Sequence, residues 1–115
     1  MTTLIYHNPR CSKSRQTLAL LEERGLQPTV VEYLETPPTP EQLQEILAML
    51  NLDARGLMRT KELVYQEQGL ADPALTQDQL VAAMVATPIL IERPIVVRDG
   101  RAALGRPPEN VLSIL

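Results

Sequence analysis

The chain of 115 residues is poor in cysteine and in aromatic residues: it has one Cys, three Tyr, and no Phe or Trp. A single cysteine excludes an intrachain disulfide framework. The scarcity of aromatic side chains also leaves little surface on which nucleic-acid bases could stack. Apolar runs long enough to span a bilayer are missing too, and the first ten residues contain only one apolar pair, Leu4 and Ile5, too short for a signal peptide. We therefore expect a cytoplasmic protein with no membrane partner.

An excess of positive charge is absent as well. The chain has 11 Lys and Arg against 14 Asp and Glu, which gives a net charge of −3. This balance argues against sequence-independent binding to nucleic-acid phosphates or to anionic lipids. We expect no nucleic-acid partner, and any anion site must come from a local arrangement of basic residues.

The first third of the chain is typical of a strand, a helix and a second strand. Thr3–Tyr6 is a short strand-like run, Ser12–Arg24 is predicted to be helical and to end at Gly25, and residues 29–34 (TVVEYL) form the second strand-like run. This order within about thirty residues indicates a parallel crossover unit. The ligand site of such a unit usually lies at the carboxyl end of its first strand, which is where Cys11 is found.

The middle of the chain is predicted to be helical. Thr39 with Gln42 and Thr76 with Gln79 are two capping boxes, each followed by apolar residues at helical spacing. Residues 52–70 between them have an interrupted helical pattern. These helices could simply be structural cover.

The last third returns to strands and closes with a helix. Arg93–Val97 and Arg101–Leu104 are joined by Asp99 and Gly100, a strong hairpin signal, and a helix is predicted after Pro107 and Pro108. Together the elements predict an α/β protein with a thioredoxin-like fold, a four-stranded mixed sheet in a single domain over residues 1–115. The helical insertion is expected at about residues 39–87.

The surroundings of Cys11 favour a chemical role for its thiol. Ser12 begins the predicted helix, and Arg10, Lys13 and Arg15 lie within four residues of the cysteine. A helix amino end and nearby cations both favour the reactive thiolate, and the same unpaired amides suit an oxyanion. The alternative is that Cys11 is a small buried hydrophobe among solvated basic residues, as free cysteines often are. At this place in the fold we favour the functional interpretation.

The stretch YHNPRCSKSR resembles the signature of the glutaredoxin-coupled arsenate reductases, the ArsC family, in which His-Asn-Pro-x-Cys-x-x-Ser-Arg surrounds the nucleophile. Further stretches resemble the family in the same order along nearly the whole chain: YLETPP, LMRTKE, QGLAD, ERPIVV and GRPPENVLSIL. The chain is similar in particular to the short YfgD-like branch.

The resemblance implies roles for named residues. Cys11 would be the catalytic thiolate, and three arginines would hold the oxyanion: Arg59, Arg93 and Arg106. Guanidinium groups suit this task because they are planar, permanently charged donors. The residues expected to support the thiolate are His7, Ser14 and Arg15, and Pro94 corresponds to the cis-proline of thioredoxin-like folds.

The resemblance also implies the reaction and the partners. The substrate would be arsenate, reduced to arsenite in arsenic detoxification, with no bound cofactor and no metal. Because the motif is Cys-x-x-Ser, Ser14 stands where a resolving thiol would be, so glutathione would act as co-substrate and a glutaredoxin would complete turnover.

Two other functions stay open at this point. One is a glutathione-dependent thiol transferase acting on protein or small-molecule disulfides. The other is a thioredoxin-fold regulator resembling Spx, which binds RNA polymerase and shares the Arg-Pro-Ile stretch. The redox switch of that regulator needs a second cysteine nearby, and Ser14 occupies its place here.

Overall fold

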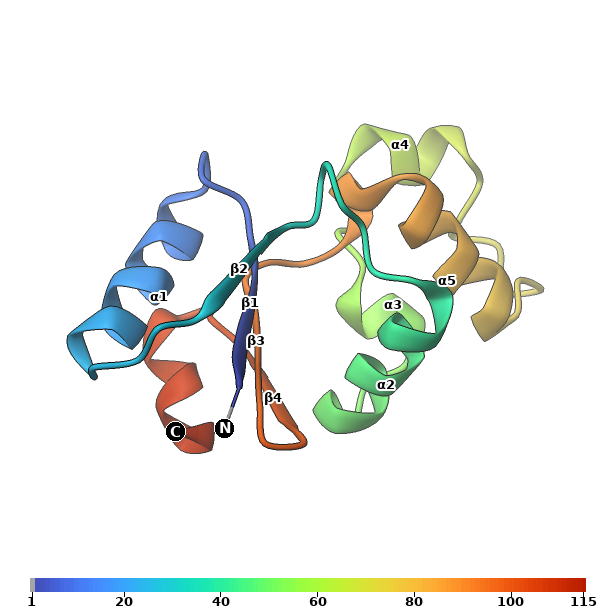
Figure 1. Cartoon of the computed structure of the whole chain (residues 1–115). Helices are drawn as coiled ribbons and strands as arrows, with labels where there is room; N and C mark the ends of the chain where they lie inside the picture. The colour runs from blue at the N-terminus through green and yellow to red at the C-terminus, as the bar shows by residue number, and fades with distance from the viewer. Residues whose placement is uncertain (1) are drawn as a thin grey trace. The chain divides into compact units, whose positions relative to one another are not determined.

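The computed structural model describes residues 2–115, which form two compact units. The first unit combines both ends of the chain, up to Thr36 and from Arg93 onward, and the second spans Pro37–Glu92 (Figure 1). The segment predicted to be a helical insertion lies inside the second unit. That the two units act as a single domain stays a prediction.

The first unit contains a four-stranded mixed sheet in the order β2-β1-β3-β4. Its strands are β1 (Thr3–His7), β2 (Thr29–Glu32), β3 (Ile95–Arg98) and β4 (Arg101–Leu104). Strand β1 pairs in parallel with β2 and antiparallel with β3, and β3 pairs antiparallel with β4. The unit therefore has the predicted thioredoxin-like α/β arrangement, and β1 delivers its carboxyl end to the segment that contains Cys11.

One face of this sheet is covered by α1 (Ser12–Glu23) and by the 3₁₀ helix η2 (Pro108–Ile114), which lie side by side in Figure 1. The core under them is aliphatic, as the lack of Phe and Trp requires. It consists of Ile5, Leu21, Val96, Ala103, Val111 and Ile114. Leu21 and Ile5 are completely buried, so α1 is held to the sheet through its apolar face.

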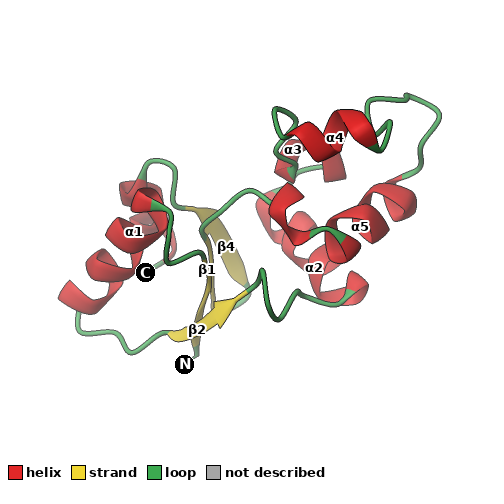
Figure 2. Ribbon diagram, turned by 90° about the horizontal axis from the view of Figure 1, so that it is seen from above, coloured by secondary structure: helices red, strands yellow, loops and turns green. Residues whose placement is uncertain are grey.

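The second unit is made of helices joined by loops (Figure 2). They are α2 (Pro40–Leu50), α3 (Ala54–Leu57), α4 (Leu63–Glu67), α5 (Gln77–Ala86) and the 3₁₀ helix η1 (Pro88–Leu90). Both predicted capping boxes are present at the starts of α2 and α5. Helix α5 contacts α2, α3 and η1, and the buried side chains Leu80, Val81 and Met84 form its inner face.

Two predicted strands differ in detail from the structure. The second strand ends at Glu32, where its carbonyl accepts hydrogen bonds from the amides of Glu35 and Thr36 and so begins a turn. The third strand begins only at Ile95, since Pro94 has no amide to donate to the sheet. The predicted closing helix is present as a 3₁₀ helix, a type that the prediction left open.

The Asp99-Gly100 hairpin is confirmed. Asp99 has φ 52° and Gly100 has φ 74°, the pair of left-handed residues that a tight two-residue hairpin needs. Over residues 2–115, no helix has the length and apolarity needed to cross a membrane.

Candidate active site

Cys11 is the N-cap residue of α1, the 12-residue helix that follows β1. Its carbonyl accepts the first helical hydrogen bond, from the Arg15 amide at 3.0 Å, and its own amide donates to the Asn8 carbonyl at 3.0 Å. The first turn contains no acidic residue. The partly exposed thiol therefore lies at the positive end of a helix without a carboxylate to oppose it.

The loop before the thiol is fixed by two side chains. Asn8 accepts a hydrogen bond through Oδ1 from the Arg10 amide at 3.0 Å, and Arg15 donates through Nη1 to the Pro9 carbonyl at 2.9 Å. Arg15 thus acts on the loop that leads to Cys11. The contact that the structure shows for Arg15 is with the loop, and its direct support of the thiolate stays a prediction.

Arg106 brings a guanidinium group to the thiol from the far end of the chain. It follows β4, and its Nη1 lies 3.9 Å from the Cys11 sulfur and 3.2 Å from the Arg93 carbonyl oxygen. The Asn110 side chain donates to the Arg106 carbonyl at 3.1 Å. One of these contacts fixes the Arg106 guanidinium and the other fixes the Arg106 carbonyl. Together they hold the cation where it can stabilise negative charge on the sulfur.

Arg93 enters this arrangement through its backbone. Its carbonyl accepts from Arg106, and the peptide bond that joins it to Pro94 is cis. The Arg106–Pro107 peptide bond is cis as well. An oxyanion-binding role for the Arg93 side chain stays a prediction.

His7 and Ser14 form a buried pair below the loop. The Ser14 hydroxyl lies 2.7 Å from His7 Nδ1 and accepts a hydrogen bond from the Asn8 amide at 3.0 Å. Burial lowers the pKa of His7 from its ordinary value of 6.5; Glu32 opposes this shift and Arg15 adds to it. The lowered pKa favours the neutral imidazole, and the pair fixes the end of β1 against the start of α1.

Arg59 belongs to the second unit, after α3. Its amide donates to the Leu90 carbonyl at 2.7 Å, and its Nη2 pairs with Glu62 at 3.3 Å. Its Nη1 is buried and has no hydrogen-bond partner among the described residues, so this guanidinium retains a donor for an anion. An approach of Arg59 to Cys11 stays a prediction.

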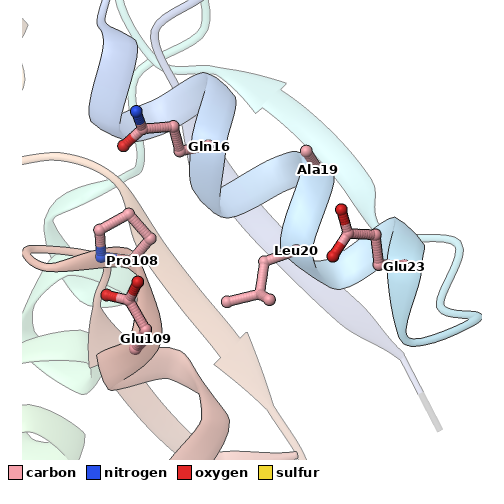
Figure 3. Close-up of a pocket in the computed structure, with 6 residues that line it drawn as sticks. All are labelled: Gln16, Ala19, Leu20, Glu23, Pro108 and Glu109. Atoms are coloured by element: carbon pink, nitrogen blue, oxygen red, sulfur yellow. The ribbon is translucent and has the colours of Figure 1, made fainter.

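Two grooves in the first unit differ in their relation to the thiol. One of about 310 Å³ is lined by residues on both sides of the loop before Cys11: His7, Asn8, Pro9, Arg10, Glu32, Leu34 and Glu35. The other, of about 380 Å³, lies between α1 and the start of η2, where Gln16, Leu20 and Glu23 face Pro108 and Glu109 (Figure 3). Its lining contains no basic residue. It therefore does not suit an oxyanion.

The chemistry available at this site is nucleophilic attack by a thiolate on an anionic substrate. The helix amino end and Arg106 both favour negative charge at the same point, and His7 is placed as a neutral hydrogen-bonding group. In the part of the chain that the structure describes, no group of three or more His, Cys, Asp and Glu side chains could hold a metal ion.

Sequence reasoning assigned no role to three residues whose contacts lie beside the site: Asn8, Thr17 and Gly105. The Asn8-Pro9 dipeptide was a turn signal that could have identified the first. Thr17 and Gly105 are 88 residues apart in the sequence, and no local sequence pattern indicates that they are in contact.

Comparison with known proteins identifies the family. The model of the ArsC family matches residues 6–114. "Arsenate reductase" of Neisseria meningitidis serogroup B is 53% identical over 112 residues, covering 96% of each chain. "Uncharacterized protein YfgD" of Escherichia coli strain K12 is 56% identical over 112 residues, covering 96% of this chain and 94% of that protein. The solved structure "Arsenate reductase from Vibrio cholerae" superposes with a TM-score of 0.97 at 55% identity, covering 100% of this chain and 98% of that one. The chain with Cys11 at its helix amino end therefore belongs to the ArsC family.

Proposed function

We propose that this protein is an arsenate reductase that uses Cys11 as its nucleophile and takes its reducing equivalents from glutathione and a glutaredoxin. The observation that carries the proposal is the Arg106 guanidinium, 3.9 Å from the sulfur of the single cysteine at the start of α1. Membership of the ArsC family and the names of the relatives support arsenate as the substrate.

In the first step the Cys11 thiolate attacks the arsenic atom of arsenate. A sulfur–arsenic bond forms, one arsenic–oxygen bond breaks, and the oxygen leaves as water after protonation. Arg106 and the free amides of the first turn of α1 would hold the oxyanion while charge moves from sulfur to the arsenate oxygens. Arg93 and Arg59 are proposed to complete the anion site, the latter with its unpaired Nη1.

In the second step a glutathione thiolate attacks the Cys11 sulfur. A sulfur–sulfur bond forms, and the electron pair of the sulfur–arsenic bond stays on arsenic, which leaves as arsenite. Arsenic has then gained two electrons, and two thiols have become one mixed disulfide at Cys11. Because the chain has one cysteine, a thiol from another molecule must reduce this disulfide, and a glutaredoxin is suited to a glutathione mixed disulfide.

Selection between arsenate and phosphate would depend on reactivity more than on binding. The two tetrahedral anions carry about the same charge, so both can occupy a site built from guanidinium groups. The arsenate centre can be reduced by thiols after attack, whereas the phosphate centre cannot. We expect phosphate to compete with arsenate without being turned over.

The test is a coupled assay with purified protein, arsenate, glutathione, glutaredoxin and an NADPH-dependent recycling system. We expect arsenate-dependent NADPH consumption that requires both glutathione and glutaredoxin, and little or none when thioredoxin is the only reductant. A mixed-disulfide substrate is assayed in parallel. Efficient reduction of that disulfide without any turnover of arsenate would instead identify a thiol transferase.

A further inference from the structure

We propose that Gly105 and Thr17 form a contact that sets the distance between Arg106 and the Cys11 thiol, and that Gly105 is a positioning residue of this site. The contact joins α1, the helix capped by Cys11, to the end of β4, after which Arg106 follows. The inference rests on the proposed function for the role of Arg106 in the reaction.

Gly105 is required by space and not by its backbone conformation. Among the described residues, the glycines with positive φ are Gly25, Gly69 and Gly100. At Gly105 a methyl group would lie 2.7 Å from Cγ of Pro94 and 3.0 Å from Cγ2 of Thr17, and closer still to the Thr17 hydroxyl. Carbon atoms do not approach this closely, so a side chain at position 105 must displace Thr17 on α1, Pro94 or the end of β4 itself.

Thr17 forms the other side of the contact. It is completely buried on the inner face of α1, and its hydroxyl donates to the Lys13 carbonyl at 2.8 Å. The Gly105 carbonyl oxygen lies 3.4 Å from the same hydroxyl. Because a hydroxyl has one hydrogen, the shorter hydrogen bond to the Lys13 carbonyl is the favoured one. The side of Gly105 facing Pro94 is fixed as well, because the Gly105 amide donates to the Pro94 carbonyl at 2.9 Å.

The position of Arg106 depends on this packing. Arg106 is the next residue after Gly105, and its Nη1 reaches both the Arg93 carbonyl at 3.2 Å and the Cys11 sulfur at 3.9 Å. The distance to sulfur is already at the long limit for a hydrogen bond, so a small separation breaks this contact and lets the exposed guanidinium turn away from the thiol. Cys11 and Thr17 both belong to the rigid helix α1 and its cap, so a shift of Thr17 is transmitted to the thiol.

The readout is the charge felt at the sulfur. Iodoacetate and iodoacetamide alkylate the same thiolate, but only iodoacetate carries a negative charge. In the ratio of the iodoacetate rate constant to the iodoacetamide rate constant, the fraction of thiolate cancels. The ratio therefore reports the positive charge near Cys11. With Arg106 in place we expect the wild-type ratio to be about threefold higher than in Arg106→Gln at low salt.

Four variants isolate the contact. Gly105→Ala adds the colliding methyl group, and Thr17→Ala removes the atoms that it would meet on α1. The double variant Gly105→Ala/Thr17→Ala moves volume from one side of the contact to the other. Gly25→Ala is the matched control, because Gly25 has φ 78° and open space around it, so alanine there strains the same unit without touching the site. Circular dichroism and thermal midpoints establish that each variant is folded.

We expect Gly105→Ala to lose at least half of the difference between wild type and Arg106→Gln, and Thr17→Ala to lose a smaller part. The double variant should lie nearer to wild type than Gly105→Ala does, and Gly25→Ala should keep the wild-type ratio despite a lower thermal midpoint. A wild-type ratio in folded Gly105→Ala, or an equal fall in Gly25→Ala, would overturn the inference. If Gly105→Ala does not fold, an unchanged ratio in Thr17→Ala overturns it. Since no arsenate is present, a failure of arsenate turnover in the separate assay would count against the proposed function alone.

Discussion

The two units of the chain differ in charge as much as in architecture. The unit built around the sheet contains eight of the eleven basic residues and six of the fourteen acidic ones, whereas the helical unit contains three basic and eight acidic residues. The net charge of −3 thus conceals a positive unit and a strongly negative one. A net charge that argues against non-specific binding of polyanions is therefore compatible with a local site for one small oxyanion.

The units also divide the site chemistry unequally. Residues 7–15 and 93–106 supply the thiol, its loop, the His7–Ser14 pair and Arg106, all within the sheet unit. From the helical unit, Arg59 is the residue proposed to act at the thiol. In the proposed mechanism, nucleophilic attack therefore depends on residues of the sheet unit, and the one residue proposed from the helical unit is an anion-binding arginine.

The sharpest test of this division is the substitution Cys11→Ser. We expect the arsenate-dependent turnover to fall by about 10⁴-fold or more, because serine is a far weaker nucleophile and the helical unit offers no second thiol. The coupled NADPH assay measures it. Residual activity within tenfold of wild type would place the nucleophile elsewhere.

Arg106→Lys tests the anion site within the sheet unit. Lysine keeps the positive charge but cannot present two parallel donors, so we expect kcat/KM for arsenate to fall by about tenfold to a hundredfold. Steady-state kinetics against arsenate concentration give the value. Unchanged kinetics would show that charge alone is needed at this position.

Arg59→Gln tests the contribution of the helical unit, with Arg55→Gln as its control. Arg55 donates to the backbone carbonyls of Leu70 and Asp72, so its loss should destabilise the helical unit by about 1–3 kcal/mol and leave kcat/KM near wild type at low temperature. Arg59→Gln should instead lower kcat/KM by about tenfold or more while changing stability little. Equal effects of the two variants on kcat/KM would restrict the oxyanion site to the sheet unit.

The smallest expected effect concerns His7. Burial lowers the pKa of His7 from 6.5, so the unfolded chain binds a proton at a higher pH than the folded chain does. The contribution of neutral His7 to the stability of the folded protein is therefore fully present above pH 6.5 and is lost as the pH falls through the lowered pKa. The free energy of unfolding should therefore decrease below pH 6.5, by at most about 1.4 kcal/mol per pH unit from this group. Urea unfolding of wild type and His7→Asn from pH 5 to 7.5 isolates the contribution. Parallel curves for the two proteins would contradict it.

The elements that could be predicted from sequence are those with local signals. The capping boxes at Thr39 and Thr76, and the Asp99-Gly100 turn, act within a few residues and appear where expected. The closing helix is present where expected, but its type could not be predicted, because hydrophobic spacing does not separate a short 3₁₀ helix from an α-helix.

The site was less accessible to sequence reasoning. The position of Cys11 followed from the strand–helix pattern, but Arg106 lies 95 residues away and could be named only through the family resemblance. The close approach of Gly105 to Thr17 and Pro94 has no sequence signal. The reason for a glycine outside a turn becomes visible only when its neighbours in space are known.

The central claim is that the lone thiol is completed by glutathione, and intact-protein mass spectrometry tests it most directly. The protein is incubated with arsenate and glutathione while glutaredoxin is withheld, and the adduct is mapped by peptide analysis. We predict one glutathione bound through a disulfide to Cys11, formed only when arsenate is present, accompanied by one arsenite and removed when glutaredoxin is added. Absence of the adduct while arsenite accumulates, or full turnover with thioredoxin as the only reductant, would contradict this mechanism.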